Sequence, residues 1–226
     1  MKKWDKLPEC MKNEAVLPYY QLLKKKKFSL FFKRLFDIFV SLLMLIILSP
    51  LFIIISLIIV IDSRGGVFYR QERVTRYGKV FRIFKFRTMV KNADKIGTQV
   101  TVSNDKRITR VGKVLRKLRL DEIPQLLNII AGDMSFVGTR PESVHYVNNY
   151  TPEMYATLLL PAGVTSEASI KYKDEAKLLD SADDADKVYI EQILPKKMKY
   201  NLEAIKKFNF IREIGIMVRT VFAVLR

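Results

Sequence analysis

The sequence predicts a mainly helical α+β protein that lies on one face of a membrane, a monotopic arrangement. Three patterns predict it: an uncharged apolar run of about 24 residues from Ile38 to Ile61, a stretch of β-branched and aromatic residues at 67–89, and apolar residues at three- and four-residue steps in much of the remainder. The 226 residues leave room for one compact domain of about 150 residues beside the membrane segment. We therefore expect a membrane-surface extension at 1–30, a membrane helix at 31–62 and a cytoplasmic domain at 63–226.

The apolar run is interrupted at its midpoint by Ser49-Pro50. Pro50 has no amide proton and its ring crowds the carbonyl of Ile46, so a helix is disturbed where lipid offers no other hydrogen-bond partner. Basic residues near the ends of a membrane segment favour the cytoplasm, and they stand on both sides of this run: Lys24 to Lys27, Lys33 and Arg34 before it, and Arg64, Arg70, Arg73, Arg76 and Lys79 after it. We therefore predict a re-entrant helical hairpin that turns at Ser49-Pro50. An ordinary signal anchor with a proline kink is the alternative, whereas the length of the run and its flanks disfavour a cleaved signal peptide.

The charge balance indicates an anionic partner. The chain has 40 lysines and arginines against 23 acidic residues, a formal net charge of +17, which suits anionic lipid, nucleic acid or nucleotide phosphates. The apolar run favours lipid, because a basic residue beside an anionic leaflet gains about 1 kcal/mol, and the lysines at 24–27 fit that role.

Cysteine and histidine are almost absent from the chain. Cys10 and His145 are the only residues of their kinds, which excludes an intramolecular disulfide, a Cys/His zinc site and a Cys-His nucleophile pair. We interpret His145 as a surface or packing residue. Dinucleotide-binding and P-loop motifs are missing from the sequence, so any chemistry must use carboxylates, hydroxyls, lysines or a hard metal ion.

The elements of the domain follow from periodicity and turn residues. Partial alternation predicts a β-hairpin within 67–89, interrupted at 77–79, and residues 93–105 are polar and typical of a loop. Apolar residues between Ile108 and Ile130 predict one amphipathic helix or two abutting short ones, ended by Gly132. The acidic segment 174–186 suggests an exposed loop or a helix start. The end of the chain, 196–226, predicts a basic amphipathic helix that lies in the membrane interface or closes the core.

Asp121 and Glu122 are the candidate catalytic residues. They fall at the start of a predicted helix, with Pro124 in its first turn, so an N-cap role for Asp121 is the simplest interpretation. A helix start also favours anions, two adjacent carboxylates can hold Mg²⁺ against a pyrophosphate, and a carboxylate can attack phosphorus to form a covalent intermediate. The cations that are close in sequence could neutralise phosphate charge: Arg107, Arg110, Lys113, Arg116, Lys117 and Arg119.

Six motifs, in order along the chain, carry a resemblance to a known family. They are KRLFD at 33–37, SP at 49–50, FKFRTM at 84–89, DKRITRVG at 105–112, LDEIPQL at 120–126 and GDMSFVGTRP at 132–141. Together they make residues 33–220 resemble the bacterial sugar transferases, the monotopic phosphoglycosyl transferases. Each motif alone is weak, but the ordered set is specific.

The resemblance implies an activity. Members of the family transfer a sugar 1-phosphate from a UDP-sugar to a polyprenol phosphate, usually undecaprenyl phosphate, and release UMP. They do so at the cytoplasmic face of the bacterial inner membrane, as the first membrane step of polysaccharide or glycoconjugate biosynthesis. We therefore expect a UDP-sugar, a polyprenol phosphate, membrane lipid and Mg²⁺ as ligands, and no nucleic acid. The sequence identifies neither the donor sugar nor the oligomeric state, and a homo-oligomer is compatible with it.

The resemblance also implies roles for residues. Asp121 would be the nucleophile that forms a phosphosugar-aspartyl intermediate, and Glu122 would help it to bind Mg²⁺. Ser49-Pro50 would be the break in the re-entrant helix. The residues expected to bind the substrate phosphates are Lys85, Arg87, Arg140 and Pro141, together with Arg116 from the cations near the dyad.

Some positions depart from the family pattern. Arg119 stands where a serine usually precedes the Leu-Asp-Glu triplet, Thr139 where a proline usually precedes the Arg-Pro pair, and Glu213 where an aspartate is common. An arginine expected further along is missing, and Lys171 or Lys173 could replace it as a point charge. A catalytically inactive family member is therefore one alternative. A basic, membrane-tethered binding protein is another, but it does not account for the ordered motifs.

Overall fold

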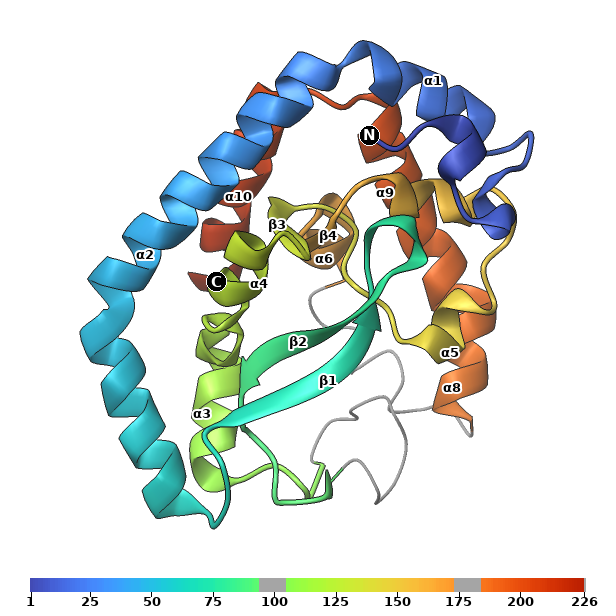
Figure 1. The fold of residues 1–226 in the computed structure, drawn as a ribbon. Coiled ribbons are helices and arrows are strands. Elements are labelled where there is room, and N and C mark those ends of the chain that lie inside the picture. The colour runs from blue at the N-terminus through green and yellow to red at the C-terminus, as the bar shows by residue number, and fades with distance from the viewer. Residues whose placement is uncertain (94–104, 173–183, 226) are drawn as a thin grey trace.

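The computed structural model describes residues 1–93, 105–172 and 184–225. As predicted, the fold is α+β and mainly helical: two small sheets of two strands each are surrounded by helices (Figure 1). The helices are α1 (Leu17–Lys25), α2 (Lys27–Asp62), α3 (Arg110–Lys117), α4 (Gln125–Ala131), α5 (Val144–Val147), α6 (Glu167–Lys171), α8 (Ala185–Val188), α9 (Leu194–Lys206) and α10 (Phe210–Leu225). The strands are β1 (Phe68–Val74), β2 (Val80–Phe86), β3 (Met134–Val137) and β4 (Ala162–Thr165).

Shorter turns complete the described part of the chain. Turns of 3-10 helix lie at Trp4–Lys6, Glu9–Met11, Arg76–Gly78, Leu120–Glu122 and Met154–Leu159, and a π-helical turn at Tyr189–Ile193 leads into α9. The predicted loop at 93–105 and the acidic segment at 174–186 lie mostly outside the described residues, which omit 94–104 and 173–183. The acidic segment ends in the start of α8, where the side chain of Asp184 accepts hydrogen bonds from the amides of Asp186 and Lys187.

Helix α2 is continuous, and this corrects the predicted hairpin. It runs unbroken from Lys27 to Asp62 with Pro50 inside it. The proline is tolerated because the hydroxyl of Ser49 donates a 2.8 Å hydrogen bond to the carbonyl of Ile46, which would otherwise receive the amide that proline lacks. The helix curves as an arc, with β1, α3, α4 and α10 on its concave side (Figure 1). The predicted break into two helical arms at Ser49-Pro50 is therefore wrong, whereas a re-entrant course of this curved helix in the membrane stays a prediction.

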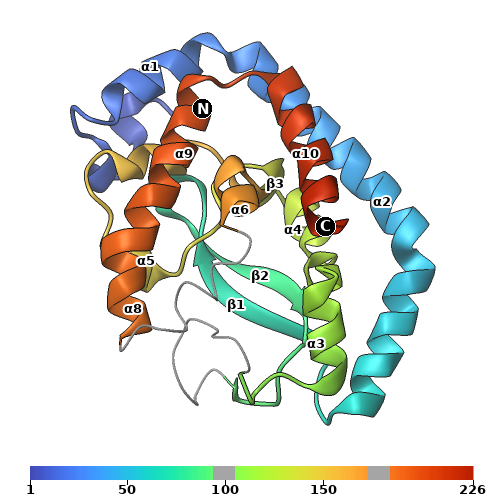
Figure 2. The same ribbon diagram turned by 180° about the vertical axis from the view of Figure 1, so that it is seen from behind.

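The outer face of α2 is apolar and exposed. Large side chains such as Phe39, Ile46 and Ile61 point away from the globular part, and the helix is long and apolar enough to cross a membrane. Both ends of α2 nevertheless contact the same globular body, whose elements fill the inside of the arc in both views (Figures 1 and 2). The location of the two ends on one side of a membrane stays a prediction.

The first third of α2 is fixed to the domain by charged residues of the KRLFD motif. Lys33 is buried, donates a 3.0 Å hydrogen bond to the carbonyl of Val137 and forms a 2.5 Å ion pair with Glu213 of α10. Arg34 donates to the last carbonyls of α4, Ile129 and Ile130. These bonds tie the apolar helix to α4, which follows the Asp-Glu pair in the chain, and to β3 and α10.

The predicted β-hairpin is confirmed. Strands β1 and β2 pair antiparallel from Phe68 opposite Phe86 to Val74 opposite Val80, and the turn between them contains Tyr77 at φ 60°. The free edge of β2 is closed by Asn128 of α4, whose side-chain oxygen accepts from the amide of Phe84 at 2.8 Å. Its amide group donates to the carbonyl of Arg82 at 3.0 Å, so α4 is held in register with β2.

The second sheet is a short parallel pair, β3 and β4, whose backbones approach very closely. A Cβ on Gly163 would lie 2.1 Å from the backbone nitrogen of Gly138, a separation that the backbone could not accept. The amide of Gly163 donates to the carbonyl of Thr139 at 2.8 Å. This contact fixes the chain just before Arg140.

The two ends of the chain complete the core. Leu7, Met11, Val16 and Leu23 are buried in the same apolar cluster as α9, so the first 25 residues are packed into the globular body rather than detached from it. Their location on a membrane surface stays a prediction. The single C-terminal helix predicted at 196–226 is two helices, because the chain breaks at 207–209. Helix α9 buries one face in the core, whereas α10 lies beside α2 (Figure 2) with Val221 and Phe222 exposed.

Candidate functional site

The Asp-Glu pair lies in the 3-10 turn η5 (Leu120–Glu122) between α3 and α4. Arg119 precedes it in the left-handed conformation (φ 56°), which costs about 1–2 kcal/mol for a residue with a Cβ and turns the chain out of α3. Neither η5 nor α4 has a side-chain cap hydrogen bond, and α4 starts at Gln125, after Pro124. The N-cap interpretation of Asp121 is therefore not supported.

Glu122 is held by two cations. Its carboxylate lies 2.5 Å from the guanidinium of Arg140 and 3.2 Å from the ammonium of Lys85, and its side chain is only 11% exposed. Burial opposes ionisation of this carboxyl, but Arg140 and Lys85 outweigh it and lower the pKa of Glu122. Glu122 is therefore a charged, immobilised group that joins η5 to β2 and to the segment after β3.

Asp121 has a different environment from its neighbour. It is 7% exposed, and within the described residues its carboxylate accepts no hydrogen bond. Burial raises the pKa of Asp121; Lys85 and Arg116 oppose the shift, and the charge of Glu122 adds to it. Arg116 of α3 is itself partly buried, and burial lowers its pKa while Asp121 raises it. The carboxyl group of Asp121 is thus buried, and nearby cations offset only part of the resulting rise in its pKa.

Comparison with known proteins identifies the family. The model of the family described as "Bacterial sugar transferase" matches residues 28–226. The chain belongs to the bacterial sugar transferase family. This finding confirms the resemblance that the six motifs indicate.

Several curated proteins of the family are similar to this sugar transferase. It is 35% identical over 199 residues to a UDP-N-acetylgalactosamine-undecaprenyl-phosphate N-acetylgalactosaminephosphotransferase of Aeromonas hydrophila, a match that covers 86% of this chain and 44% of that protein. It is 36% identical over 159 residues to a putative undecaprenyl-phosphate N-acetylgalactosaminyl 1-phosphate transferase of Bacillus subtilis, covering 70% of this chain and 87% of the other. A UDP-glucose:undecaprenyl-phosphate glucose-1-phosphate transferase of Escherichia coli is 33% identical, over 84% of this chain and 39% of its own length. The chain thus spans less than half of the Aeromonas and Escherichia proteins and most of the Bacillus protein.

The structure brings three of the predicted site residues of this sugar transferase to the Asp-Glu pair and places others elsewhere. Lys85, Arg116 and Arg140 surround the pair. Arg87 instead donates to the carbonyls of Ser63 (2.6 Å) and Arg64 (2.9 Å) at the C-terminal end of α2. In a longer strand Arg87 would share the face of Lys85, but β2 ends at Phe86, and beyond it Arg87 meets the C-terminal carbonyls of α2, which need donors. We therefore interpret Arg87 as a cap of α2 and not as a phosphate ligand.

The remaining predicted residues have structural positions. Pro141 is buried next to Arg140 and fixes the backbone there, and Ser49 and Pro50 lie on the exposed outer face of α2. Glu213 pairs with Lys33, as described, and burial raises its pKa against the effect of that lysine. Lys173 lies outside the described residues. His145 contacts Asp186 at 2.8 Å near the surface, in agreement with the interpretation as a surface or packing residue.

Two residues near the site of this sugar transferase are not predicted as site residues from its sequence. Gln125 is 1% exposed, and neither its amide nitrogen nor its oxygen has a hydrogen-bond partner in the described structure. Arg73 of β1 lies within electrostatic reach of Arg140. The period of two in a strand could have indicated Arg73, because residues 69, 71 and 73 share one face of β1.

The residues present limit how Mg²⁺ could bind. Lys85 and Arg140 already engage the carboxylate of Glu122, and the described chain holds no group of three or more acidic, histidine or cysteine side chains suited to a metal. A cage made by the protein alone therefore does not fit. Mg²⁺ more often takes one or two carboxylates and completes its shell with waters and substrate phosphates, and the carboxylate of Asp121 fits that mode.

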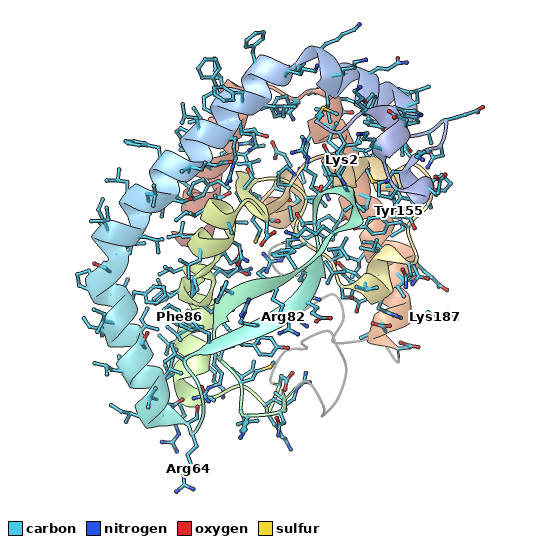
Figure 3. All side chains as sticks on the ribbon, viewed as in Figure 1. Lys2, Arg64, Arg82, Phe86, Tyr155 and Lys187 are labelled. Atoms are coloured by element: carbon cyan, nitrogen blue, oxygen red, sulfur yellow. The ribbon has the colours of Figure 1, made fainter. Side chains whose placement is uncertain are left out.

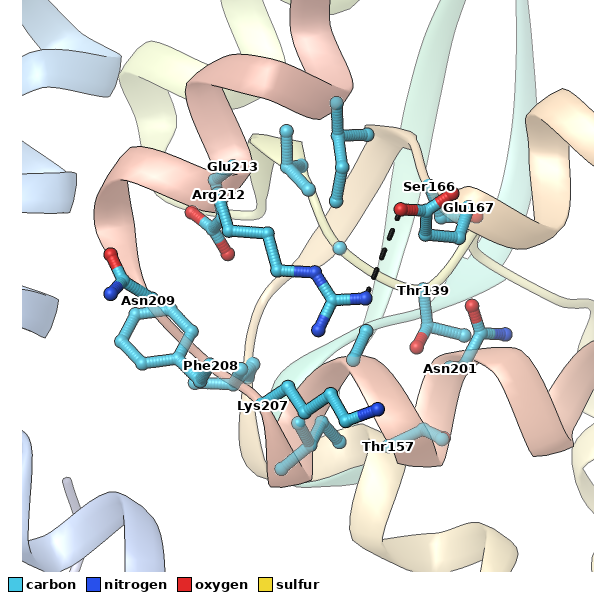
Figure 4. Close-up of a pocket in the computed structure, with 16 residues that line it drawn as sticks. Thr139, Thr157, Ser166, Glu167, Asn201, Lys207, Phe208, Asn209, Arg212 and Glu213 are labelled. Carbon is cyan, nitrogen blue, oxygen red and sulfur yellow. Dashed lines mark ion pairs between the residues drawn. The ribbon is translucent and has the colours of Figure 1, made fainter. Parts of the chain in front are cut away.

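A separate pocket lies between β3, α6, α9 and α10 (Figure 4). Glu167 and Arg212 face each other across it at 3.9 Å, with Thr139 and Lys207 at its wall. Its lining does not include Asp121 or Glu122. We therefore do not assign this pocket to the chemistry of the dyad.

Proposed function

We propose that this protein is a polyprenyl-phosphate sugar-1-phosphate transferase: it moves a sugar 1-phosphate from a UDP-sugar to undecaprenyl phosphate and releases UMP. The observation that carries the proposal is the unlike pair of acids, a buried, raised-pKa Asp121 beside Glu122, which is fixed by Lys85 and Arg140. The printed names of the relatives support the reaction class, because they are undecaprenyl-phosphate transferases of N-acetylgalactosamine 1-phosphate or glucose 1-phosphate.

The reaction proceeds in two displacements at one phosphorus. A carboxylate oxygen of Asp121 attacks the phosphorus that carries the sugar, and the bond from that phosphorus to the oxygen shared with the second phosphate breaks. The electron pair leaves with UMP, and a phosphosugar-aspartyl intermediate remains. An oxygen of polyprenyl phosphate then attacks the same phosphorus, which restores the Asp121 carboxylate and yields the polyprenyl diphosphate sugar.

The cations of the site make this sequence favourable. The donor diphosphate and the acceptor phosphate repel each other, and two successive displacements let them use one cationic pocket in turn. Lys85, Arg116 and Arg140 neutralise the charge that gathers on the transferred phosphoryl group. Asp121 would hold Mg²⁺ together with waters and donor phosphates, with the charge of Glu122 beside it, and the ion would make UMP a better leaving group.

The membrane supplies the acceptor. Helix α2 is proposed to lie in the bacterial inner membrane from its cytoplasmic side, as a bent re-entrant helix, and to hold the dyad at the level of the lipid headgroups. Two other relatives are exopolysaccharide production proteins of Sinorhizobium fredii and Rhizobium leguminosarum, each 44% identical over about half of this chain. They support a role in polysaccharide biosynthesis. The donor sugar stays open, since the relatives are named for different sugars.

The test is UMP release by the purified protein with a panel of UDP-sugars, polyprenyl phosphate and Mg²⁺. Asp121→Asn should abolish UMP release, because an amide cannot act as the nucleophile. Asp62→Asn is the matched control: Asp62 accepts from the amide of Val111 at 3.4 Å, outside the site, and its replacement should leave turnover unchanged. No UMP from any donor would favour a catalytically inactive member or a basic binding protein, and the latter predicts salt-sensitive binding that is indifferent to Asp121.

A further inference from the structure

The face of the β-hairpin that includes Lys85 also includes a second basic residue, Arg73. The pairing sets Tyr69 opposite Lys85, Gln71 opposite Ile83 and Arg73 opposite Phe81. Directly opposed residues of an antiparallel pair point to the same side of the sheet, so Arg73 shares a face with Lys85. Lys85 binds Glu122 from that face, whereas Arg82 lies on the other, exposed face with Glu72 (Figure 3).

Arg73 makes few hydrogen bonds within the described residues. It is partly buried, and the described structure gives it one hydrogen bond, from Nη2 to the side-chain oxygen of Gln71 at 2.6 Å. A guanidinium has five N–H donors. Burial lowers the pKa of Arg73; the negative charge of Glu142 opposes the shift and the positive charge of Arg140 adds to it.

The nearby acid is already engaged by other groups. Glu142 accepts a 2.7 Å hydrogen bond from the hydroxyl of Tyr189 and lies 3.6 Å from the ammonium of Lys197. The amide of Val74, the residue after Arg73, donates to the carbonyl of Glu142 at 2.9 Å, which holds the segment of Arg140 beside the end of β1. Arg73 therefore lies near Arg140 and has donors that the described residues do not use. An anion bound between the two arginines would relieve the repulsion and use these donors.

We propose that Arg73, oriented by Gln71, forms a second anion-binding subsite beside the dyad and binds the phosphate of the donor that leaves as UMP. This inference depends on the proposed function. The donor carries two phosphates: Lys85, Arg116 and Arg140 surround the carboxylates at which one of them reacts, and Arg73 is the next cation along the same face. Negative charge grows on the leaving UMP as the bond breaks, so a fixed guanidinium there accelerates the first displacement.

The position of Arg73 favours the soluble donor over the lipid acceptor. Phe68, at the start of β1, packs against Phe52 of the apolar helix with ring centroids 5.7 Å apart. Arg73 is five residues further on, roughly 17 Å along the strand, and β1 runs away from the C-terminal end of α2 (Figure 1). The phosphate of a membrane-bound lipid stays near α2, whereas the nucleotide enters from the side of the domain.

The experiment compares Arg73→Gln and Arg73→Lys with Arg82→Gln, which removes the same charge from the outer face of the same hairpin. Binding of UDP is measured by calorimetry without turnover, and the KM values for donor and acceptor are measured separately. We expect Arg73→Gln to weaken UDP binding and to lower kcat/KM for the donor by about 10- to 100-fold, with the acceptor KM unchanged. Arg73→Lys should recover part of the loss, because lysine keeps the charge but not the fork of donors. Arg82→Gln should behave as the wild type.

Three results would overturn the subsite: wild-type UDP affinity in Arg73→Gln, a loss confined to the acceptor KM, or an equal loss in Arg82→Gln. If Arg73→Gln does not fold, the UDP affinity of Arg73→Lys is the test instead. An affinity of Arg73→Lys equal to that of the wild type would contradict the proposal. Failure of the proposed function is distinguishable. In that case the wild type releases no UMP from any donor, although UDP binding still depends on Arg73.

Discussion

The carboxylate of Glu122 and the guanidinium of Arg140 are joined by contacts of 2.5 and 3.4 Å, although the residues are 18 positions apart in the chain. Glu122 is thereby held in its charged form, with a lowered pKa, while the pKa of the adjacent Asp121 is raised. Two neighbouring carboxylates with opposite pKa shifts are suited to different roles. We assign the fixed charge to Glu122 and the nucleophile to Asp121.

UMP release should rise with pH through a pKa above about 3.9, the ordinary value of an aspartate, because only ionised Asp121 can attack phosphorus and its pKa is raised mainly by burial. Folding responds to pH in a different range. The lowered pKa of Glu122 stabilises the folded state above its unfolded pKa of about 4.3, and this contribution is lost as the pH falls below that value. Initial rates and thermal unfolding across the same pH values would separate the two effects. An acid limb at or below 3.9 in folded protein would contradict the assignment.

Removal of Mg²⁺ should stop turnover without unfolding the protein. Glu122 is already paired with cations, and the described residues form no cage of three acidic, histidine or cysteine ligands, so no structural metal is expected. Treatment with EDTA is therefore expected to abolish UMP release, and added Mg²⁺ to restore it, with Tm unchanged. Full activity in EDTA would exclude the proposed metal. A large fall in Tm would indicate a structural ion instead.

Ser49→Ala should destabilise α2 more than Ser56→Ala does. The hydroxyl of Ser49 satisfies the carbonyl of Ile46, which Pro50 deprives of an amide, whereas the hydroxyl of Ser56 contacts Phe52, whose carbonyl keeps its helical amide partner. Loss of the first bond leaves a carbonyl unpaired and should cost about 1–3 kcal/mol, against a smaller loss at Ser56. Thermal unfolding in detergent measures both. Equal effects would show that the Ser49 bond does not compensate for the proline.

Gly163→Ala should destabilise the protein, because its Cβ would overlap the backbone of Gly138. We expect a loss of about 1–3 kcal/mol, equivalent to roughly 2–4 °C in Tm per kcal/mol. Gly66→Ala is the control, since a Cβ there meets nothing within 4 Å. UMP release should fall as well, because this contact fixes the chain before Arg140. A Tm for Gly163→Ala equal to that of Gly66→Ala would mean that β3 and β4 separate without cost.

The sequence predicts elements whose signals are local. The hairpin at 67–89 and the end of α4 at Gly132, which takes φ 90°, follow from alternation and from the turn residues. The continuous course of α2 was missed because one hydroxyl, that of Ser49, offsets the loss of an amide, and its geometry is set only within the helix. The packing of residues 1–25 was missed because their core partners in α9 are far away in sequence.

The site shows the same limit. The motifs identify Asp121 and Glu122, but not which basic residues reach them. Arg87 looks equivalent to Lys85 in the sequence, yet it lies beyond the end of β2 and donates to the carbonyls at the end of α2. Arg73 carries no motif signal, and its position emerges only from the pairing of β1 with β2.

The most direct test is the mass of the intact chain after incubation with a UDP-sugar and Mg²⁺ in the absence of acceptor, followed by an acid quench. The account predicts a mass gain of one sugar phosphate, located on the peptide that contains Asp121, with release of one UMP per modified chain. Added polyprenyl phosphate should remove the modification, and Asp121→Asn should never acquire it. UMP release that requires the acceptor and leaves no modified chain, or a modification that persists in Asp121→Asn, would contradict it.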